Sequence, residues 1–498
     1  MSTGLETRRR LTLAATILGS SLAFIDATVV VVALPRIEDD LGLGLTGQQW
    51  VYLSYSLALA ALYLPAGALG DRWGRRETFI WGAVGFALAS ALAGAAPNEA
   101  VLLVARVLQG VAGALLTTNS LALLRATFGP ESGRAIGLWT AWTGVSTIAG
   151  PPVGGALVEW ASWRWIFFIN LPLAAATVWL ARAGRCEERE ELAARRLDVP
   201  GAATAAVAFG ALTYAVVEGA DRGFGSVWWA FALAVVSFVA FVVVQRRVEA
   251  PLLPFSLFRR RNFTASNLET FVVYAALGGV LVYITLYLQF LGFTPFEAGL
   301  ATVPTSVVMI LLSARFGKLA DQHGPRLYLT VGPLLIGAGA LLFLPMTTES
   351  DFWTFGLPGL LVFALGLSML VAPITATALS SVSTEYAGIA SGVNSTISRL
   401  GNLLAVAVIG LVVTLVFANP DAVPLEARQI DPALRAASID GFRAGMIVVA
   451  ALAFLGAAVG WLGISNDEAR SPEDAGSAEN EPVSNAVAAR RVSSSCGS

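Results

Sequence analysis

Four ionisable residues lie inside long apolar stretches of this 498-residue chain: Asp26, Arg106, Glu269 and Arg399. A carboxylate at the centre of a membrane helix costs about 2.5–3.5 kcal/mol on insertion scales, so it normally faces a partner or a water-filled cavity. Because burial favours the neutral acid, Asp26 can be protonated in one environment and charged in another. These four residues predict a site for protons or charged solutes. The alternative for Asp26 is a permanently paired structural carboxylate.

Arg106 begins a polar stripe on one face of a predicted helix. Gln109, Gly110, Gly113 and Thr117 follow it at spacings of three, four, seven and eleven residues, which place all five on the same side of an α-helix. Such a stripe must face protein or water. Alternatively, the Arg106 side chain extends to carbonyl or phosphate groups at the membrane boundary.

Two aromatic pairs at a spacing of three residues are candidates for the wall of an apolar pocket. They are Trp139 with Trp142, and Phe271 with Tyr274. Residues three apart lie on the same helix face, so each pair presents one aromatic surface. The alternative is that these rings face lipid.

Most enzyme chemistry is excluded by residue counts. The chain has one histidine, His323, and two cysteines, Cys186 and Cys496, too few for a Cys/His metal site. Its one lysine, Lys318, precedes a leucine, so the phosphate-binding loop of an ATP-driven pump is absent. We therefore expect a protein that is not an enzyme and has no cofactor. Any pumping must use an ion gradient or a partner's ATPase.

The elements that position these residues are membrane helices. Apolar residues make up 56% of the chain and charged residues 13%, too few charges for a water-facing surface. A bilayer core of about 30 Å takes roughly 20 residues per helix, and the apolar content suffices for about fourteen such spans. The predicted spans are 11–34, 49–69, 79–96, 101–124, 135–158, 165–182, 199–218, 226–245, 264–291, 297–314, 327–345, 355–379, 389–417 and 442–464.

Arginine placement predicts that both termini are cytoplasmic. Arg8, Arg9 and Arg10 precede the first span, and the arginine-rich loops 182–196 and 246–261 fall on the same side, as the positive-inside rule requires. The first span is too long for a signal peptide and lacks an A-x-A site, so we expect it to remain uncleaved. We expect a disordered tail after residue 464 and reduced cysteines in cytoplasmic segments.

An internal repeat divides the chain into two halves. Residues 67–76 read GALGDRWGRR and residues 317–326 read GKLADQHGPR, an offset of 250 residues, and both are predicted short cytoplasmic turns. Spans 1–6 then correspond to spans 9–14, with spans 7 and 8 inserted between them. The predicted units are an N-terminal segment 1–10, a six-helix half 11–182, loops and inserted helices 183–262, a second half 263–464, and a tail 465–498.

These motifs together resemble the major facilitator superfamily, and specifically its 14-helix drug:proton antiporters. The 67–76 string matches the superfamily's loop 2–3 motif, and residues 106–110 (RVLQG) match its span-4 motif. In span 5, Gly137, Gly150, Pro151 and Gly154 match the antiporter motif, although Ser146 replaces a glycine. Asp26-Ala27-Thr28 and Ala33-Leu34-Pro35 resemble the span-1 signature, with Val31 in place of the usual asparagine.

The resemblance implies functional roles for these residues. It implies that Arg106 takes part in proton transfer by favouring the charged form of a nearby acid. It also implies a cytoplasmic latch in the two repeat loops, where the alternative is a positively charged anchor. For the antiporter motif the alternative is a kink that packs helices together. The residues predicted for the latch are Gly67, Asp71, Arg72, Gly74, Arg75, Arg76, Asp321, Gly324 and Arg326.

The expected protein is an all-α polytopic transporter in the plasma membrane. We expect proton-coupled antiport that exports lipophilic drugs or antibiotics, cationic ones included, by alternating access of the two halves. Its partners are small lipophilic substrates, protons and the bilayer, with no nucleic acid, and it is expected to function as a monomer. The alternatives are a metabolite or lipid exporter or facilitator with different coupling, and a non-transporting membrane sensor.

Overall fold

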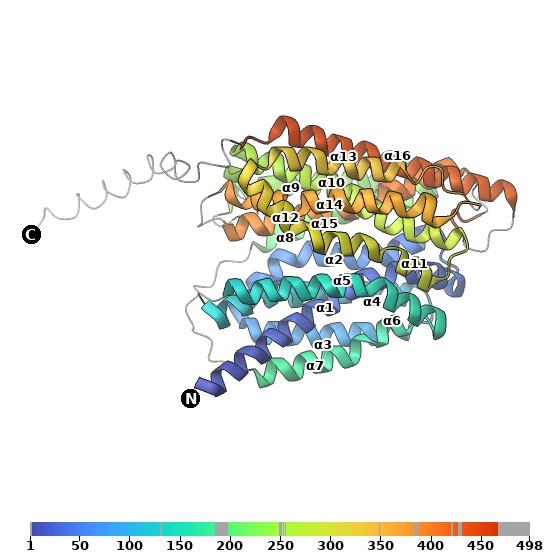
Figure 1. The fold of residues 1–498 in the computed structure, drawn as a ribbon. Helices are drawn as coiled ribbons and strands as arrows, with labels where there is room; N and C mark the ends of the chain where they lie inside the picture. Colours follow the sequence, from blue (N-terminus) through green and yellow to red (C-terminus); the bar gives the residue numbers. More distant parts are fainter. Residues whose placement is uncertain are drawn as a thin grey trace, which may run out of the picture.

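The computed structural model describes residues 2–129, 132–184, 198–248, 251, 253, 255–347, 349–382, 387–419, 422–426 and 431–466. Over these ranges the chain is almost entirely helical, and none of them contains a β-strand. The helices lie side by side in one elongated bundle (Figure 1). The polytopic α-helical class predicted from the composition is confirmed.

The first half of the bundle contains the six predicted spans that precede the insertion. Its spans 1–5 are single helices, and span 6 is divided into a short helix and a longer one. These helices are α1 (Ser2–Leu41), α2 (Gly44–Trp73), α3 (Arg75–Gly94), α4 (Glu99–Phe128), α5 (Ser132–Trp160), α6 (Trp165–Phe168) and α7 (Asn170–Ala183).

The second half lies above the first in the view of Figure 1. Two inserted helices precede it, α8 (Val199–Arg222) and α9 (Trp228–Arg247), with the 3-10 segment η2 (Phe255–Arg259). The half itself consists of α10 (Arg261–Phe290), α11 (Pro295–Ala301), α12 (Val303–His323), α13 (Arg326–Leu341), the π-helical turn η3 (Phe352–Gly356), α14 (Leu357–Ser380), α15 (Ala387–Phe417) and α16 (Pro432–Gly463).

Each predicted span coincides with a helical segment, but three segments are interrupted. Span 10 is divided at Thr302, and the proline at the start of α12 lacks the backbone donor that a continuous helix would need. By length and apolar composition, eleven segments of the described chain are candidate membrane spans, and α13 is a shorter apolar helix. The protein is thus a multi-pass membrane protein, and the number of fourteen crossings stays a prediction.

The repeat loops share one geometry. Gly74 and Gly324, which correspond in the repeat, both end a helix with φ +92°, a backbone conformation that favours glycine. The last arginine of each copy then joins the third helix of its half to the sixth. Arg76 Nη1 donates to the Ala181 carbonyl at 2.6 Å, and Arg326 Nε donates to the Trp461 carbonyl at 2.8 Å. In both halves this arginine holds together the helix ends that lie beside the repeat loop.

The inserted helix α8 packs against both halves, on α2 and on α15. Trp50 Nε1 of α2 donates to Glu218 Oε1 of α8 at 2.8 Å, and the Trp50 ring lies 6.1 Å from that of Tyr214. A second region of this interface contains an apolar cavity of about 170 Å³, which is lined by residues of α2, α8, α9 and α15. The insertion therefore covers one seam between the halves.

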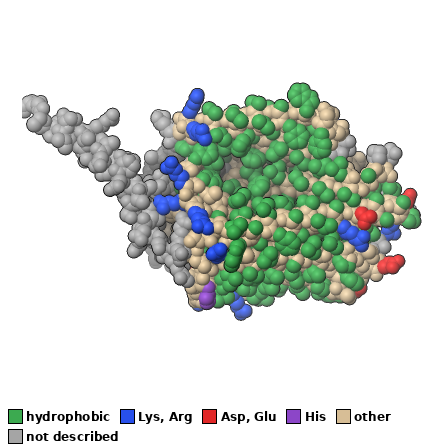
Figure 2. All heavy atoms as spheres, turned by 90° about the horizontal axis from the view of Figure 1, so that it is seen from above, with side chains coloured by type: hydrophobic (Ala, Val, Ile, Leu, Met, Phe, Trp, Pro, Cys, Tyr) green, Lys and Arg blue, Asp and Glu red, His purple; other side chains and the backbone are tan. Residues whose placement is uncertain are grey.

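The surface is consistent with a membrane protein that has one cationic end. On the face shown in Figure 2, apolar side chains form a broad band across the bundle, and Lys and Arg side chains gather at the end that carries the N-terminus. We call this the terminal end and the opposite one the distal end. Helix α16 also finishes at the terminal end, where Arg261 donates to the carbonyls of Leu462 and Gly463.

Several predictions fall on parts of the chain that the structure does not describe. Cys186 and Cys496 lie outside the described residues, as do most of loop 182–196 and the tail after residue 466. The side chain of Asp71, a predicted latch residue, is also outside the description.

Candidate functional site

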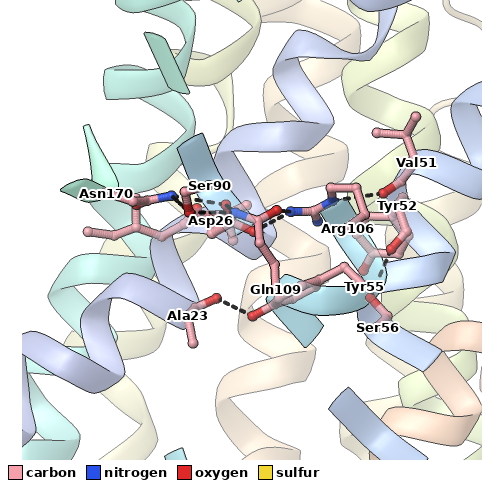
Figure 3. A network of polar contacts seen from close by, with 12 residues as sticks. Ala23, Asp26, Val51, Tyr52, Tyr55, Ser56, Ser90, Arg106, Gln109 and Asn170 are labelled. Atoms are coloured by element: carbon pink, nitrogen blue, oxygen red, sulfur yellow. Dashed lines mark hydrogen bonds and ion pairs between the residues drawn. The ribbon is translucent and has the colours of Figure 1, made fainter. Parts of the chain in front are cut away.

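Asp26 and Arg106 form an ion pair deep in the first half (Figure 3). Arg106 Nη1 of α4 lies 2.5 Å from Asp26 Oδ2 of α1, and both side chains are completely buried. Arg106 Nε also donates to the Val51 carbonyl of α2 at 3.0 Å, and the guanidinium lies 4.4 Å from the centroid of the Tyr55 ring. Two residues that the sequence identified separately therefore form one unit.

Three uncharged side chains complete what we call the Asp26 network: Gln109, Asn170 and Ser90. Gln109 Nε2 of α4 donates to Asp26 Oδ1 at 3.1 Å and to Ser90 Oγ of α3 at 2.8 Å. Asn170 Nδ2 of α7 donates to the same Asp26 oxygen at 3.2 Å. The carboxylate thus accepts from one cation and two amides.

The sequence stripe on α4 explains how the helices come close enough for this network. Gly110 and Gly113 face α2, and a Cβ at Gly110 would lie 2.7 Å from Ala58 Cβ. The close approach places Arg106 within reach of the α2 backbone. Gln109 and Thr117 of the same stripe are also buried, so the whole stripe faces protein.

A central cavity of about 340 Å³ lies between the two halves. Helices α1, α2 and α4 of the first half form one side, and α10 and α15 of the second half form the other. The Asp26 network lies behind the first-half wall, and Asp26 and Arg106 are not among the residues that line the cavity. The lining residues are Ala23, Phe24, Ala27, Thr28, Tyr52, Tyr55, Ser56, Leu59, Thr117, Tyr274, Leu281, Ser395, Ser398, Arg399 and Asn402.

Arg399 of α15 is a charged residue in the cavity wall. Its guanidinium lies 4.7 Å from the centroid of the Tyr63 ring of α2, across the interface between the halves. Within the described part of the chain it has no ion pair and no hydrogen bond. Among the described residues, Arg399 therefore presents a cation without a counter-charge.

The cavity is closed toward the distal end by hydrogen bonds between the halves. Gln49 Nε2 donates to the Tyr283 hydroxyl at 2.9 Å, and Gln289 Nε2 donates to the Val32 carbonyl at 3.0 Å. Nearer the cavity, the Tyr52 hydroxyl donates to Asn402 Oδ1 at 3.0 Å. These contacts lie where α1 and α10 end and α2 begins, so the distal ends of the halves are held together.

Glu269 lies in α10, inside the second half and away from the central cavity. Its side chain is completely buried, and neither carboxyl oxygen has a hydrogen-bond partner among the described residues. A Cβ added at Gly460 of α16 would lie 3.3 Å from Glu269 Oε1, so the carboxyl group faces α16. An isolated charge there would be costly, which makes Glu269 a second candidate for proton binding.

The aromatic candidates divide between the cavity, the helix packing and the surface. Tyr274 lines the cavity, whereas Phe271 is not among its lining residues. Trp139 packs edge-on against the cavity residue Phe24 and donates from Nε1 to Ser20 Oγ at 3.0 Å. Trp142 is 55% exposed, as a lipid-facing ring would be.

In the antiporter motif, two glycines pack α5 against α1. A Cβ at Gly154 would lie 2.9 Å from Val29 Cγ1, and Gly150 touches Thr28 of the same helix. Pro151 packs against Gly299 of α11, in the other half, whereas Gly137 has open space around it. The geometry favours the packing interpretation of this motif.

The cytoplasmic latch in the two repeat loops stays a prediction. Asp321 lines a cleft of about 280 Å³ against α14 of its own half, and no described residue forms a hydrogen bond or ion pair with it. Arg75 donates to the Ala122 carbonyl at 3.2 Å, a contact within one half.

Ser90 and Asn170 were missed by the sequence analysis, as were Tyr52, Tyr55 and Asn402. The available signal was weak, because a single Ser or Asn within an apolar span is common in membrane helices. Only the rotation of each helix about its axis shows that these side chains converge.

The fold and site define a class of protein: a helical membrane protein of two similar halves with a central cavity between them, closed at one end. That is the architecture of a transporter. In comparisons with known proteins, the family model described as Major Facilitator Superfamily matches residues 16–406. The chain belongs to the Major Facilitator Superfamily and is a transporter, not an enzyme.

Similar proteins include several named for drug resistance or export. The multidrug resistance protein Stp of Mycobacterium tuberculosis (strain CDC 1551 / Oshkosh) is 37% identical over 410 residues, 81% of this chain and 75% of that protein. The puromycin resistance protein pur8 of Streptomyces alboniger is 34% identical over 475 residues, 93% of this chain and 92% of that protein. The tetracenomycin C resistance and export protein of Streptomyces glaucescens is 35% identical over 417 residues, 82% of this chain and 77% of that protein.

Solved structures share the fold at low sequence identity. A bacterial homologue of the human lysosomal transporter Spinster, in an inward-facing and unoccupied conformation, aligns with a TM-score of 0.68 and 17% identity, covering 93% of this chain and 98% of that one. A D-xylose–proton symporter aligns with a TM-score of 0.64 and 14% identity, covering 92% and 98%. These likenesses support the fold alone.

Proposed function

We propose that this protein exports lipophilic drugs or antibiotics across the plasma membrane in exchange for protons. The observation that carries the proposal is the central cavity between two halves, closed at the distal end and backed by the buried Asp26 network. Relatives named for resistance or export supply the direction of transport and the drug-like substrate class. The cationic terminal end faces the cytoplasm by the positive-inside rule.

Alternating access follows from the way the halves meet. Opening the distal end requires the Gln49–Tyr283 and Gln289–Val32 hydrogen bonds to break while the terminal end closes. The Tyr52–Asn402 contact beside the cavity then changes as well, because it also joins the halves. A substrate in the cavity is thereby exposed first to one side of the membrane and then to the other.

Proton exchange is assigned to the Asp26 network, with Glu269 as the second carrier. Protonation of Asp26 would remove its attraction to Arg106 and release α4 from α1, whereas loss of the proton would restore the pair. Tyr55 transmits such a change, because its ring contacts Arg106 and its hydroxyl donates to the Ala23 carbonyl beside the cavity.

A vesicle experiment tests the proposal. Inverted membrane vesicles that contain the protein are acidified by respiration, candidate antibiotics are added, and a fluorescent dye reports the pH gradient. We expect substrates to dissipate the gradient only in vesicles that contain the protein. Accumulation of substrate without any change in the gradient would favour a facilitator, or an exporter with different coupling.

A further inference from the structure

We propose that the central cavity selects aromatic organic anions, bound through a carboxylate or phenolate oxygen to Arg399. This inference rests on the proposed function, because it takes the central cavity as the substrate site, and it names the chemical class that the cavity prefers. It differs from the expectation drawn from Asp26, which favoured cations.

The first observation is an unneutralised cation in the cavity wall. Arg399 lies at membrane depth in α15. Its guanidinium lies over the Tyr63 ring, and it has no hydrogen bond or ion pair with any described residue. A ring face offers a cation much less stabilisation than a carboxylate does. A guanidinium in this position favours a ligand that brings a negative charge.

The second observation is the location of the acidic groups. None of the described residues that line the cavity is Asp or Glu. The Asp26 carboxylate lies behind the wall, where Arg106 already neutralises it. Glu269 faces α16, on another side of α10. Among the described residues that line the cavity, Arg399 is therefore the one charged side chain.

The third observation is the character of the remaining wall. Phe24 and Tyr274 supply aromatic faces from opposite halves, and offset stacking on such faces favours a flat ring system. Ser395 Oγ and Asn402 Nδ2 lie on the same helix as Arg399 and have no recorded acceptor in the described chain, so both can donate to a ligand oxygen. The wall thus combines ring faces with donors grouped around one cation.

Arginine distinguishes sharply between charged analogues of one shape. Its planar fork donates two parallel hydrogen bonds to a carboxylate, and these bonds strengthen where water is excluded. A carboxamide of the same shape offers one acceptor and no charge. An amidinium is repelled, because it would place a second cation beside Arg399.

Three anthracene derivatives that differ only in the polar group test this selection: the 2-carboxylate, the 2-carboxamide and the 2-carboxamidinium. Their binding to the purified full-length protein in detergent is measured by equilibrium dialysis against protein-free micelles, which corrects for partitioning. We expect the carboxylate to bind at least about tenfold more tightly than the amide. We expect the amidinium to bind most weakly.

Variants of Arg399 test whether this residue causes the preference for the carboxylate over the amide. Arg399→Gln should lower carboxylate affinity about tenfold, to the level of the amide, and leave amide affinity unchanged; Arg399→Lys should retain part of the preference. Arg315→Gln, at an exposed arginine of α12, is the matched control and should change nothing.

The proposal is overturned if the carboxylate shows no binding up to millimolar concentration, if the amidinium binds most tightly, or if Arg399→Gln leaves the carboxylate-to-amide ratio unchanged. The vesicle assay separates this failure from failure of the proposed function. Drug-dependent dissipation of the pH gradient without carboxylate preference would refute only the substrate class. Carboxylate preference without transport would refute only the export function.

Discussion

Asp26 and Arg106 show why a buried ion pair is a sensitive point in a membrane protein. Both side chains are removed from water, and Asp26 has contacts from three donors. Removing one charge of such a pair leaves the other unpaired, which typically costs about 3–5 kcal/mol, whereas removing both charges together is often close to neutral. This asymmetry gives a stability test that does not depend on transport.

We predict that Asp26→Asn lowers the thermal stability of the purified protein and that the double variant Asp26→Asn, Arg106→Gln recovers part of the loss. The single change should cost about 3 kcal/mol, because it leaves the Arg106 guanidinium buried without a counter-charge. Thermal unfolding followed by intrinsic tryptophan fluorescence measures both variants. If the double variant were less stable than wild type by the sum of the losses measured for Asp26→Asn and Arg106→Gln alone, the charges would not act as a pair.

The same residue should also control coupling. Asp26→Asn resembles a permanently protonated state, so we expect it to abolish drug-dependent dissipation of the pH gradient in inverted vesicles, whereas Asp26→Glu keeps part of it. Glu269→Gln is the parallel variant for the second carrier. Wild-type dissipation in Asp26→Asn, together with a loss in Glu269→Gln, would assign coupling to Glu269 and leave Asp26 a structural carboxylate.

Individual charges could be found in the sequence, but their partners could not. Asp26, Arg106, Glu269 and Arg399 stand out because charges inside apolar spans are rare. Whether such a charge lies beside a counter-charge, among apolar side chains or in a cavity wall depends on the rotation of each helix about its axis. That rotation is fixed by packing between distant segments. The sequence therefore could not show that Asp26 is paired while Arg399 has no ion pair among the residues that the structure describes.

At the scale of elements, small residues set the distances between helices. Gly154 lets α5 approach α1 closely, whereas at Gly137, one residue of the same motif, an added Cβ would contact no described residue of another helix within 4 Å. The two glycines look equivalent in the sequence motif. Their surroundings show that only Gly154 is needed for a close contact.

We therefore predict different effects for the same substitution at these two glycines. Gly154→Ala should destabilise the protein by about 1–3 kcal/mol, because its Cβ would crowd Val29 Cγ1 and Cα, at 2.9 and 3.1 Å. Gly137→Ala should be neutral or slightly stabilising, since alanine is the better helix former. Thermal unfolding of the two variants beside wild type measures the difference, and an equal effect at both positions would contradict the packing interpretation.

The helices themselves were largely predictable, because apolar stretches of membrane length dominate the sequence. The repeat was equally visible, and the structure gives Gly74 and Gly324 the same φ of +92°. The interruptions between α6 and α7 and between α11 and α12 were not predicted, since a hydropathy pattern continues across a local break. The position of α8 across the seam between the halves also had no sequence signal, because it depends on contacts with both α2 and α15.

At the scale of the whole molecule, alternating access requires two states, one open at each end of the cavity. The contacts between the two halves indicate that the structure has the state with a closed distal end. The distal ends are joined by side-chain hydrogen bonds, and the cavity lies on the terminal side of them. Arginine and lysine side chains gather at the terminal end (Figure 2), so the positive-inside rule orients that end toward the cytoplasm. Together these features predict from which side the cavity can be reached.

We predict that a cysteine at Ser395, in the cavity wall, reacts with a membrane-impermeant maleimide from the cytoplasmic side only. The variant Ser395→Cys is made in a background in which Cys186 and Cys496 are replaced by serine, and it is labelled in inverted vesicles and in intact cells. Labelling should occur in the inverted vesicles, because the Gln49–Tyr283 and Gln289–Val32 contacts close the distal end.

Glu349→Cys in the same background is the matched control, because this exposed residue lies in the distal loop between α13 and η3. It should be labelled in intact cells and protected in sealed inverted vesicles, the opposite pattern to Ser395→Cys. If both cysteines reacted from the same side, the closed distal end would be wrong. Labelling of Glu349→Cys from the cytoplasmic side would identify the orientation as the error, since that residue is accessible whichever end of the cavity is open.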